Sequence, residues 1–131
     1  MKKTATLALA AIASIAMLTG CSSSNEATKK VNPVEFSEVI AQSGVIILDV
    51  RTPEEFNAGH IANAININFA GSDFASEVSK LDKNATVAVY CRSANRSALA
   101  TKEMADLGFI NMFDMQGGII DWEAAGGPVV K

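Results

Sequence analysis

Short apolar runs alternate with helical patterns along residues 31–131. Strand-like runs lie at residues 45–50, 64–67, 86–90 and 111–115, with a further edge strand near residues 30–32. Helical patterns fill the segments between them, and two helices begin with complete capping signals. This alternation predicts an α/β fold in three layers, with a mostly parallel sheet of about five strands and helices on both faces. The capping signals are Asn32-Pro33-Val34-Glu35 and Thr52-Pro53-Glu54-Glu55.

Ligands of parallel sheets bind beyond the carboxyl ends of the strands. Three of the predicted strands end at residues 50, 90 and 115, so the segments that begin with Arg51, Cys91 and Gln116 should meet there. Cys91 is the chemically reactive member of this group. We therefore expect the functional site around the turn that follows the third clear strand, with the sequence Cys91-Arg92-Ser93-Ala94-Asn95-Arg96-Ser97.

Cys91 lies between a strand and the helix predicted at residues 95–107. The N–H groups and the dipole at the start of a helix favour an anion, and two arginines follow within five residues. Cysteines in such surroundings are reactive as thiolates. The polar sequence after Cys91 favours an exposed thiol over a buried, inert one. The loop amides of residues 92–97 are expected to curl toward one point as an anion nest, to which Ser97 can add its hydroxyl.

The N-terminus has the pattern of a secretory signal. Lys2 and Lys3 precede an apolar run from Leu7 to Leu18, which is too short to span a bilayer. The run ends in Leu18-Thr19-Gly20-Cys21, which resembles the lipobox of bacterial lipoproteins. That resemblance implies a lipid on Cys21 and a mature chain that starts there. The alternative is an ordinary signal peptide with a chance cysteine.

Three segments follow from this interpretation: a signal peptide at 1–20, a lipidated cysteine and flexible tether at 21–30, and one folded domain at 31–131. Ser22 after the anchor points to the outer membrane facing the periplasm. In a Gram-positive cell, the same signal would place the protein on the outer face of the cell membrane. With the sulfur of Cys21 bound to lipid, Cys91 is the one free thiol and no internal disulfide can form.

Composition excludes several function classes. Without Lys2 and Lys3 the eleven basic residues become nine, against fourteen acidic ones, so the net charge of the remaining chain is −5. An acidic domain without a basic cluster argues against nucleic-acid binding. One histidine, His60, and two cysteines cannot supply a zinc site, and the sequence predicts neither a metal nor another cofactor.

Four motifs, in order, resemble those of single-domain rhodaneses, and the resemblance covers residues 31–131. It implies a sulfurtransferase of the thiosulfate type. The Cys91 thiolate would take the outer sulfur of thiosulfate or a similar donor, release sulfite and carry a persulfide. Cyanide, a small thiol or an unidentified protein acceptor would then remove the sulfur. The motifs are Leu48 to Phe56, Gly59 to Asn66, Cys91 to Ser97, and Gly117 to Trp122.

Two details of the loop bear on this resemblance. Related cysteine phosphatases carry five residues between cysteine and arginine, whereas four separate Cys91 from Arg96, which favours sulfur over phosphate. Ala94 stands where such loops usually carry glycine. Either Ala94 has a negative φ, or the loop is slightly reshaped and activity is lower, because alanine is strained in the left-handed region.

The remaining conspicuous residues have weaker functional signals. Arg92 either recruits an anionic donor or is a solvated surface residue. Arg96 holds the anion or, in the interpretation we favour, braces the loop against Asp49 or Glu55. The others are interpreted as structural: Asp49 and Arg51 as supports of the loops, His60 as a link between the second helix and the sheet, Gly117-Gly118 as a tight turn, Trp122 as core, and Met112 and Met115 as strand packing.

Three alternatives to a sulfurtransferase remain open from the sequence. The first is a persulfide carrier or sensor that needs a partner protein. The second is a rhodanese-like phosphatase or arsenate reductase, which the length of the loop disfavours. The third is a non-catalytic interaction domain, which the intact Cys91 and both loop arginines disfavour.

Overall fold

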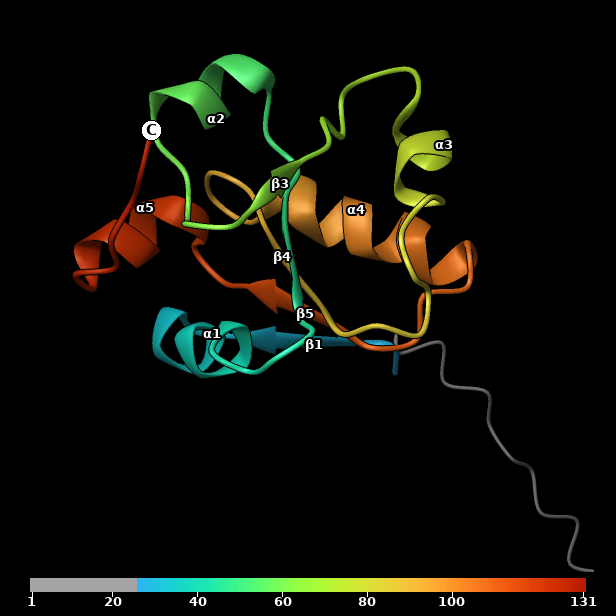
Figure 1. The fold of residues 1–131 in the computed structure, drawn as a ribbon, viewed down its shortest axis with the longest axis horizontal. Helices are drawn as coiled ribbons and strands as arrows, with labels where there is room; N and C mark the ends of the chain where they lie inside the picture. The colour runs from blue at the N-terminus through green and yellow to red at the C-terminus, as the bar shows by residue number, and fades with distance from the viewer. Residues whose placement is uncertain (1–25) are drawn as a thin grey trace, which may run out of the picture.

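The structure, a computed structural model, describes residues 26–131 and consists of a parallel sheet between two layers of helices (Figure 1). The predicted signal segment and Cys21 lie outside the described residues. The five strands lie in the order β1-β5-β4-β2-β3, and every pairing is parallel. In chain order the elements are β1 (Thr28–Val31), α1 (Pro33–Ile40), β2 (Ile46–Asp49), α2 (Pro53–Ala58), β3 (Ile65–Asn66), α3 (Phe74–Val78), β4 (Val87–Tyr90), α4 (Asn95–Asp106), β5 (Met112–Met115) and α5 (Gly118–Ala124).

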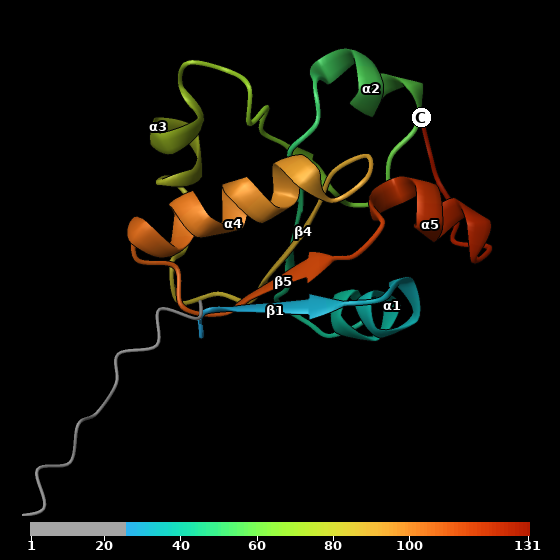
Figure 2. The same cartoon turned by 180° about the vertical axis from the view of Figure 1, so that it is seen from behind.

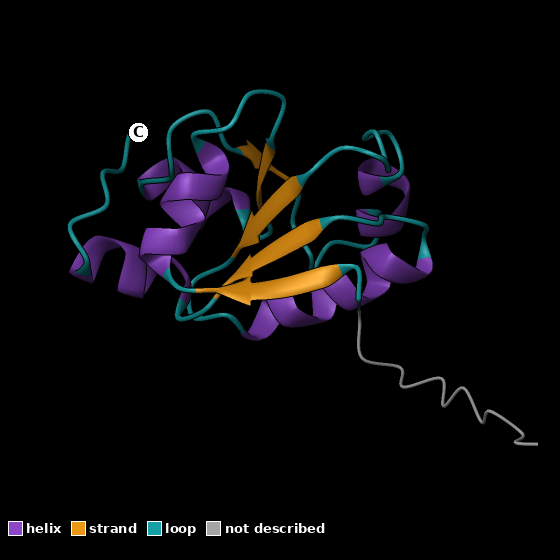
Figure 3. Cartoon of the chain, turned by 90° about the horizontal axis from the view of Figure 1, so that it is seen from below, coloured by secondary structure: helices purple, strands orange, loops and turns teal. Residues whose placement is uncertain are grey.

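Strand β4 lies at the centre of the sheet and all four of its residues are buried. Its side chains alternate between two apolar clusters, as the pleat of a strand requires. Val87 and Val89 pack on the side of α3 and α4, and Ala88 and Tyr90 pack on the side of α1 and α5. Figure 3 shows helices on both sides of the sheet. The predicted three-layer α/β fold is therefore confirmed.

The two predicted capping boxes are present. The side chain of Asn32 accepts a hydrogen bond from the Glu35 N–H at 3.0 Å, and Glu35 accepts one from the Asn32 N–H at 2.9 Å. Thr52 and Glu55 make the same reciprocal pair at 3.3 and 3.2 Å. These bonds satisfy backbone donors at the starts of α1 and α2 that have no partner within the helix.

The predicted tether ends earlier than the sequence indicated. Residues 28–30, placed in the tether, belong to β1, which pairs along its whole length with β5 at the edge of the sheet (Figure 2). The sequence of β1 gives a weak signal because only Val31 is buried, and Lys29 and Lys30 are exposed. Charged residues are usual on an edge strand, where they discourage pairing with other chains.

Other elements are shorter than predicted, although the residues flanking them still pack against the core. The strand expected at 64–67 is reduced to the two residues of β3, which pair only with β2 at the opposite edge. Helix α3 ends at Val78, and Leu81 beyond it packs on the same cluster as Val78. Met112, Met115 and Trp122 are buried in the core, as expected. No helix among residues 26–131 is long and apolar enough to cross a membrane.

Candidate functional site

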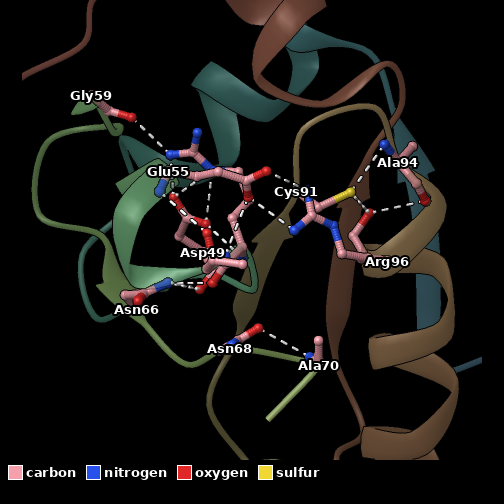
Figure 4. A network of polar contacts seen from close by, with 12 residues as sticks. Asp49, Glu55, Gly59, Asn66, Asn68, Ala70, Cys91, Ala94 and Arg96 are labelled. Carbon is pink, nitrogen blue, oxygen red and sulfur yellow. Dashed lines mark hydrogen bonds and ion pairs between the residues drawn. The ribbon is translucent and has the colours of Figure 1, made fainter. Parts of the chain in front are cut away.

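Cys91 is the first residue after β4 and precedes α4 at the carboxyl end of the sheet (Figure 4). Its Sγ atom accepts a hydrogen bond from the Ala94 N–H at 3.0 Å. The thiol also donates to the Ser97 Oγ atom at 3.5 Å. The loop therefore places one backbone donor and one hydroxyl against the sulfur, next to the positive end of a helix dipole.

The expectation of an exposed thiol is wrong, because Cys91 is only 1% exposed. Its side chain continues the alternation of β4 and points to the same side as Val87 and Val89. The sequence after Cys91 is polar because Arg92, Ser93 and Asn95 face solvent, while the sulfur itself lies beneath the loop. The polar residues after Cys91 therefore indicated that the outer surface of the loop faces solvent. They gave no information on where the Cys91 side chain lies.

Ala94 adopts the left-handed conformation, with φ of 82° and ψ of −6°. The sequence left two alternatives for Ala94, a negative φ or a reshaped loop with lower activity. The first of these alternatives is wrong. A residue with a Cβ atom costs about 1–2 kcal/mol in this region, whereas glycine adopts it freely. The loop nevertheless keeps the geometry in which the Ala94 N–H points at the sulfur, so the strain is balanced by the surrounding contacts.

Arg96 braces the loop against α2, and the partner is Glu55. Two hydrogen bonds of 2.9 and 3.1 Å join its guanidinium to the two carboxylate oxygens. The hydrogen bond from Arg96 is the largest cause that lowers the pKa of Glu55, and the same bond raises the pKa of Arg96. Because Glu55 also closes the capping box of α2, one carboxylate connects the start of α2 with the start of α4.

Asp49 and Arg51 form a buried ion pair beneath the neighbouring loop. The Arg51 Nη2 atom lies 2.7 Å from Asp49 Oδ2 and also donates to the Gly59 carbonyl at 2.7 Å. Burial alone would lower the pKa of Arg51, but the hydrogen bonds and charge of Asp49 outweigh it and raise that pKa. The pair holds the segment between β2 and α2 against the end of α2 at Gly59.

Two further supports of this end of the sheet escaped the sequence analysis. The Asn66 side-chain amide donates to the carbonyls of Asp49 and Arg51, at 3.1 and 2.9 Å. The Tyr90 hydroxyl accepts a hydrogen bond from the Ile61 N–H at 3.1 Å. The sequence could have indicated both residues, because each is the last residue of a strand, Asn66 of β3 and Tyr90 of β4.

His60 connects α2 to the C-terminal segment, and the predicted link to the sheet is wrong. Its ring stacks on Phe56 with centroids 3.7 Å apart, and its Nδ1 atom lies 2.9 Å from the Phe56 carbonyl oxygen. Its backbone exchanges two hydrogen bonds with Val130, which forms no part of the central sheet. The next residue, Ile61, makes the contact with the sheet instead, because its N–H donates a hydrogen bond to the hydroxyl of Tyr90 in β4.

Helix α5 begins in direct backbone contact with the Cys91 loop. The N–H groups of Ile119 and Ile120 donate to the carbonyls of Cys91 and Arg92, at 2.9 and 3.3 Å. A Cβ atom at Gly118 would lie 2.4 Å from the Arg92 carbonyl carbon. The expected tight turn at Gly117-Gly118 is present. Its second residue has to be glycine because the backbone of Gly118 lies against the backbone of Cys91 and Arg92.

A cavity of about 330 Å³ opens beside this contact, at the outer side of the loop. Arg92, which is exposed, contributes to its wall together with Glu55 and Glu123. Cys91 is not among the lining residues. Within residues 26–131 no group of three or more histidine, cysteine, aspartate or glutamate side chains is arranged to hold a metal ion.

The chain belongs to the family of proteins with a rhodanese-like domain, because the model of that family matches residues 32–125. It is 30% identical to the thiosulfate sulfurtransferase GlpE of Coxiella burnetii, over 73% of this chain and 88% of that protein. A crystal structure of a rhodanese-related protein from Thermoplasma volcanium superposes with a TM-score of 0.69 at 37% identity, covering 78% of this chain and 97% of that one.

A plant relative is similar over only part of its length. The chain is 36% identical to the senescence-associated protein DIN1 of Raphanus sativus, over 69% of this chain and 55% of that protein. The chain covers 55% to 60% of the length of the first three curated relatives that it matches. Family membership therefore defines the domain, whereas the reaction and its partners have to be argued from the site.

The Asp49–Arg51 pair provides a test of how the site is supported. Asp49→Asn should destabilise the fold by about 3–5 kcal/mol, because it leaves the buried Arg51 charge without a counter-ion. Urea unfolding followed by tryptophan fluorescence measures the change. As a matched control, Asp73→Asn replaces an exposed aspartate and should change stability by less than about 0.5 kcal/mol. Equal effects of the two substitutions would contradict a supporting role for the pair.

Proposed function

We propose that the chain is a sulfurtransferase that moves sulfane sulfur from thiosulfate or a similar anion to cyanide or a thiol through a Cys91 persulfide. The Cys91 thiolate attacks the outer sulfur of the donor, and a new S–S bond forms. The old bond between that sulfur and the sulfonate breaks, and sulfite leaves with its electron pair. The acceptor then attacks the terminal sulfur, and Cys91 departs as a thiolate.

The observation that supports this proposal best is the surroundings of Sγ. The Ala94 N–H donates to the sulfur at 3.0 Å, at the start of α4, where a negative charge is stabilised. No general base is needed for a thiolate to attack, and His60 lies against Phe56 rather than at the sulfur. The four-residue spacing from Cys91 to Arg96 also favours a sulfur atom over a phosphate group, by the pattern of the family.

Arg92 is the residue that we propose meets the incoming donor. It is exposed and lines the cavity outside the loop. Arg96 does not compete for this role because Glu55 neutralises it. Within residues 26–131 Arg92 forms no salt bridge, so its guanidinium is available to a dianion such as thiosulfate.

A second function, that of a persulfide carrier or sensor, is favoured by one observation. Cys91 is nearly inaccessible, and it does not line the neighbouring cavity. A partner protein that displaces the loop would give a donor or acceptor access to the sulfur. In this case the isolated chain would take up sulfur but release it slowly.

We also propose that Cys21 carries a lipid anchor, at the outer membrane facing the periplasm or at the outer face of a Gram-positive cell membrane. The described chain enters the domain at the start of β1, at the amino end of the sheet. Cys91 lies at the carboxyl end. An anchor on the N-terminal side would therefore join the domain at the end of the sheet opposite to the Cys91 loop.

The sulfurtransferase proposal predicts a covalent intermediate on Cys91. Incubation with thiosulfate should add one sulfur atom to the intact mass, and cyanide should remove it with formation of thiocyanate. Cys91→Ser should abolish both signals, whereas Ser93→Ala, on the solvent side of the loop, should retain them. A wild-type chain that gains no sulfur would refute the proposal. Uptake without appreciable turnover would instead establish the carrier function.

The strained residue of the loop predicts a gain of activity. Ala94→Gly should raise the rate of persulfide formation by up to about tenfold, because glycine removes about 1 kcal/mol or more of strain at φ of 82°. Single-turnover mass spectrometry measures the rate. Ala98→Gly, in the regular part of α4, is the control and should lower stability without raising the rate. An unchanged rate for Ala94→Gly would mean that the strain does not limit the reaction.

The anchor predicts a dependence of membrane partition on Cys21. The protein expressed in a Gram-negative host should enter the detergent phase in Triton X-114 separation, and Cys21→Ser should shift it to the aqueous phase. Ser22→Ala is a neighbouring control that should leave partition unchanged. Detergent-phase partition that survives Cys21→Ser would overturn the anchor proposal without affecting the sulfurtransferase proposal.

A further inference from the structure

The last residues of the chain connect two helices that lie on either side of the cavity beside the Cys91 loop. After α5 ends at Ala124, residues 126–131 run back to α2 (Figure 1). Val130 forms an isolated antiparallel bridge with His60, two residues beyond the end of α2. Residues 126–131, which we call the strap, lie outside the region that the family model matches, since that region ends at residue 125.

Hydrogen bonds hold the strap near both helices. Near α5, the Trp122 Nε1 atom donates to the Pro128 carbonyl at 3.0 Å, and the Gly127 N–H donates to the Trp122 carbonyl at 2.8 Å. Near α2, the His60 N–H donates to the Val130 carbonyl at 2.9 Å, and the Val130 N–H donates to the His60 carbonyl at 2.8 Å. Because Trp122 is buried in the core, the strap joins a fixed point of the domain to the end of α2.

Helix α2 depends on such bonds because none of its residues is buried. A helix without a buried face gains little from packing, so the bonds at its two ends set its position. At its start, Glu55 pairs with Arg96. At its end, the Arg51 Nη2 atom donates to the Gly59 carbonyl at 2.7 Å, and the strap bonds to His60, the next residue. The strap therefore contributes directly to the position of α2.

The cavity of about 330 Å³ has α2 on one side and α5 on the other. Near the sulfur, the loop joins these two walls. Arg96 of α4 bonds to Glu55 of α2, and the Arg92 carbonyl accepts a hydrogen bond from the Ile120 N–H of α5. At the far ends of both helices, the strap joins the walls. The distance between the walls thus depends on the strap as well as on the loop.

We propose that the strap holds α2 against the cavity, and that Val130 is thereby a positioning residue for capture of the anionic donor. Arg92, the residue proposed to meet the donor, lies in the wall of this cavity. Release of the strap lets the Gly59 end of α2 move outward, which widens the cavity and weakens donor binding. The bonds of Sγ to Ala94 and Ser97 lie within the loop and stay unchanged. The inference rests on the proposed function, because it assigns the donor of that reaction to this cavity.

Two substitutions at one position test the strap in single-turnover persulfide formation. Val130→Pro removes the N–H that donates to the His60 carbonyl, whereas Val130→Ala is the conservative variant that keeps both backbone bonds. Val130→Pro should raise the half-saturating thiosulfate concentration by about two- to tenfold, as for the loss of one hydrogen bond, with the rate at saturation unchanged. Val130→Ala should behave as the wild type, because the Val130 side chain is already 43% exposed.

Hydrogen exchange, followed by mass spectrometry of peptic peptides, measures the strap without any sulfur chemistry. In Val130→Pro the amides of residues 56–60 should exchange faster than in Val130→Ala, whereas those of α4 should be unchanged. Cys91→Ser cannot form a persulfide and provides the reciprocal measurement in the presence of thiosulfate. If the strap strengthens donor binding, bound thiosulfate has to slow exchange in α2 and the strap, because coupling between two sites is mutual.

The outcomes separate failure of this inference from failure of the proposed function. Equal half-saturating concentrations for Val130→Pro and Val130→Ala would overturn the inference, even if α2 exchanges faster, because the strap would then only stabilise the fold. If Val130→Pro does not fold, the exchange of Cys91→Ser decides, and an α2 that does not respond to thiosulfate would overturn the inference. An α2 that responds to thiosulfate in a chain that takes up no sulfur would support the strap and refute the sulfurtransferase.

Discussion

The position of β4 at the centre of the sheet is the constraint on which the site depends. Because neighbouring strands bond to both of its edges and helices cover both faces, the direction of every side chain along β4 is determined. Cys91 continues that alternation by one residue and thus points beneath α4. The chain then turns into α4 within a few residues, which directs the Ala94 N–H at the sulfur. Access to the nucleophile, its electrostatic surroundings and its contact with Ser97 all follow from this one placement.

The loop is held from outside by two helices, α2 and α5. Helix α2 contributes Glu55, which pairs with Arg96. Helix α5 donates two backbone N–H groups to the carbonyls of Cys91 and Arg92, at a distance that only Gly118 permits. These external bonds explain how Ala94 can remain in a left-handed conformation that is unfavourable for alanine. They also leave Arg92, at the outer side of the loop, exposed to solvent.

The acidic groups of this domain divide into two kinds according to their surroundings. Asp49 is buried but is satisfied by Arg51, and Glu55 is partly exposed and satisfied by Arg96. Asp114 is buried, forms no salt bridge with any residue of the described part of the chain, and lies beneath α4. Burial raises the pKa of Asp114, whereas the hydrogen bond from Arg96 lowers the pKa of Glu55.

The sequence by itself determined the α/β class, the capping boxes at Asn32 and Thr52, the turn at Gly117-Gly118 and the position of Cys91 at the carboxyl end of a strand. These features depend on local hydrogen bonding and on the period of apolar residues, which a chain carries in its order alone. Only the tertiary structure decided the burial of Cys91, the choice of Glu55 over Asp49 as the partner of Arg96, the strand at residues 28–31 and the contact of His60 with Val130. It also brought Asp114 beneath Ser97, seventeen residues away along the chain. Each of these results depends on which distant segments pack together, and no local pattern encodes that information.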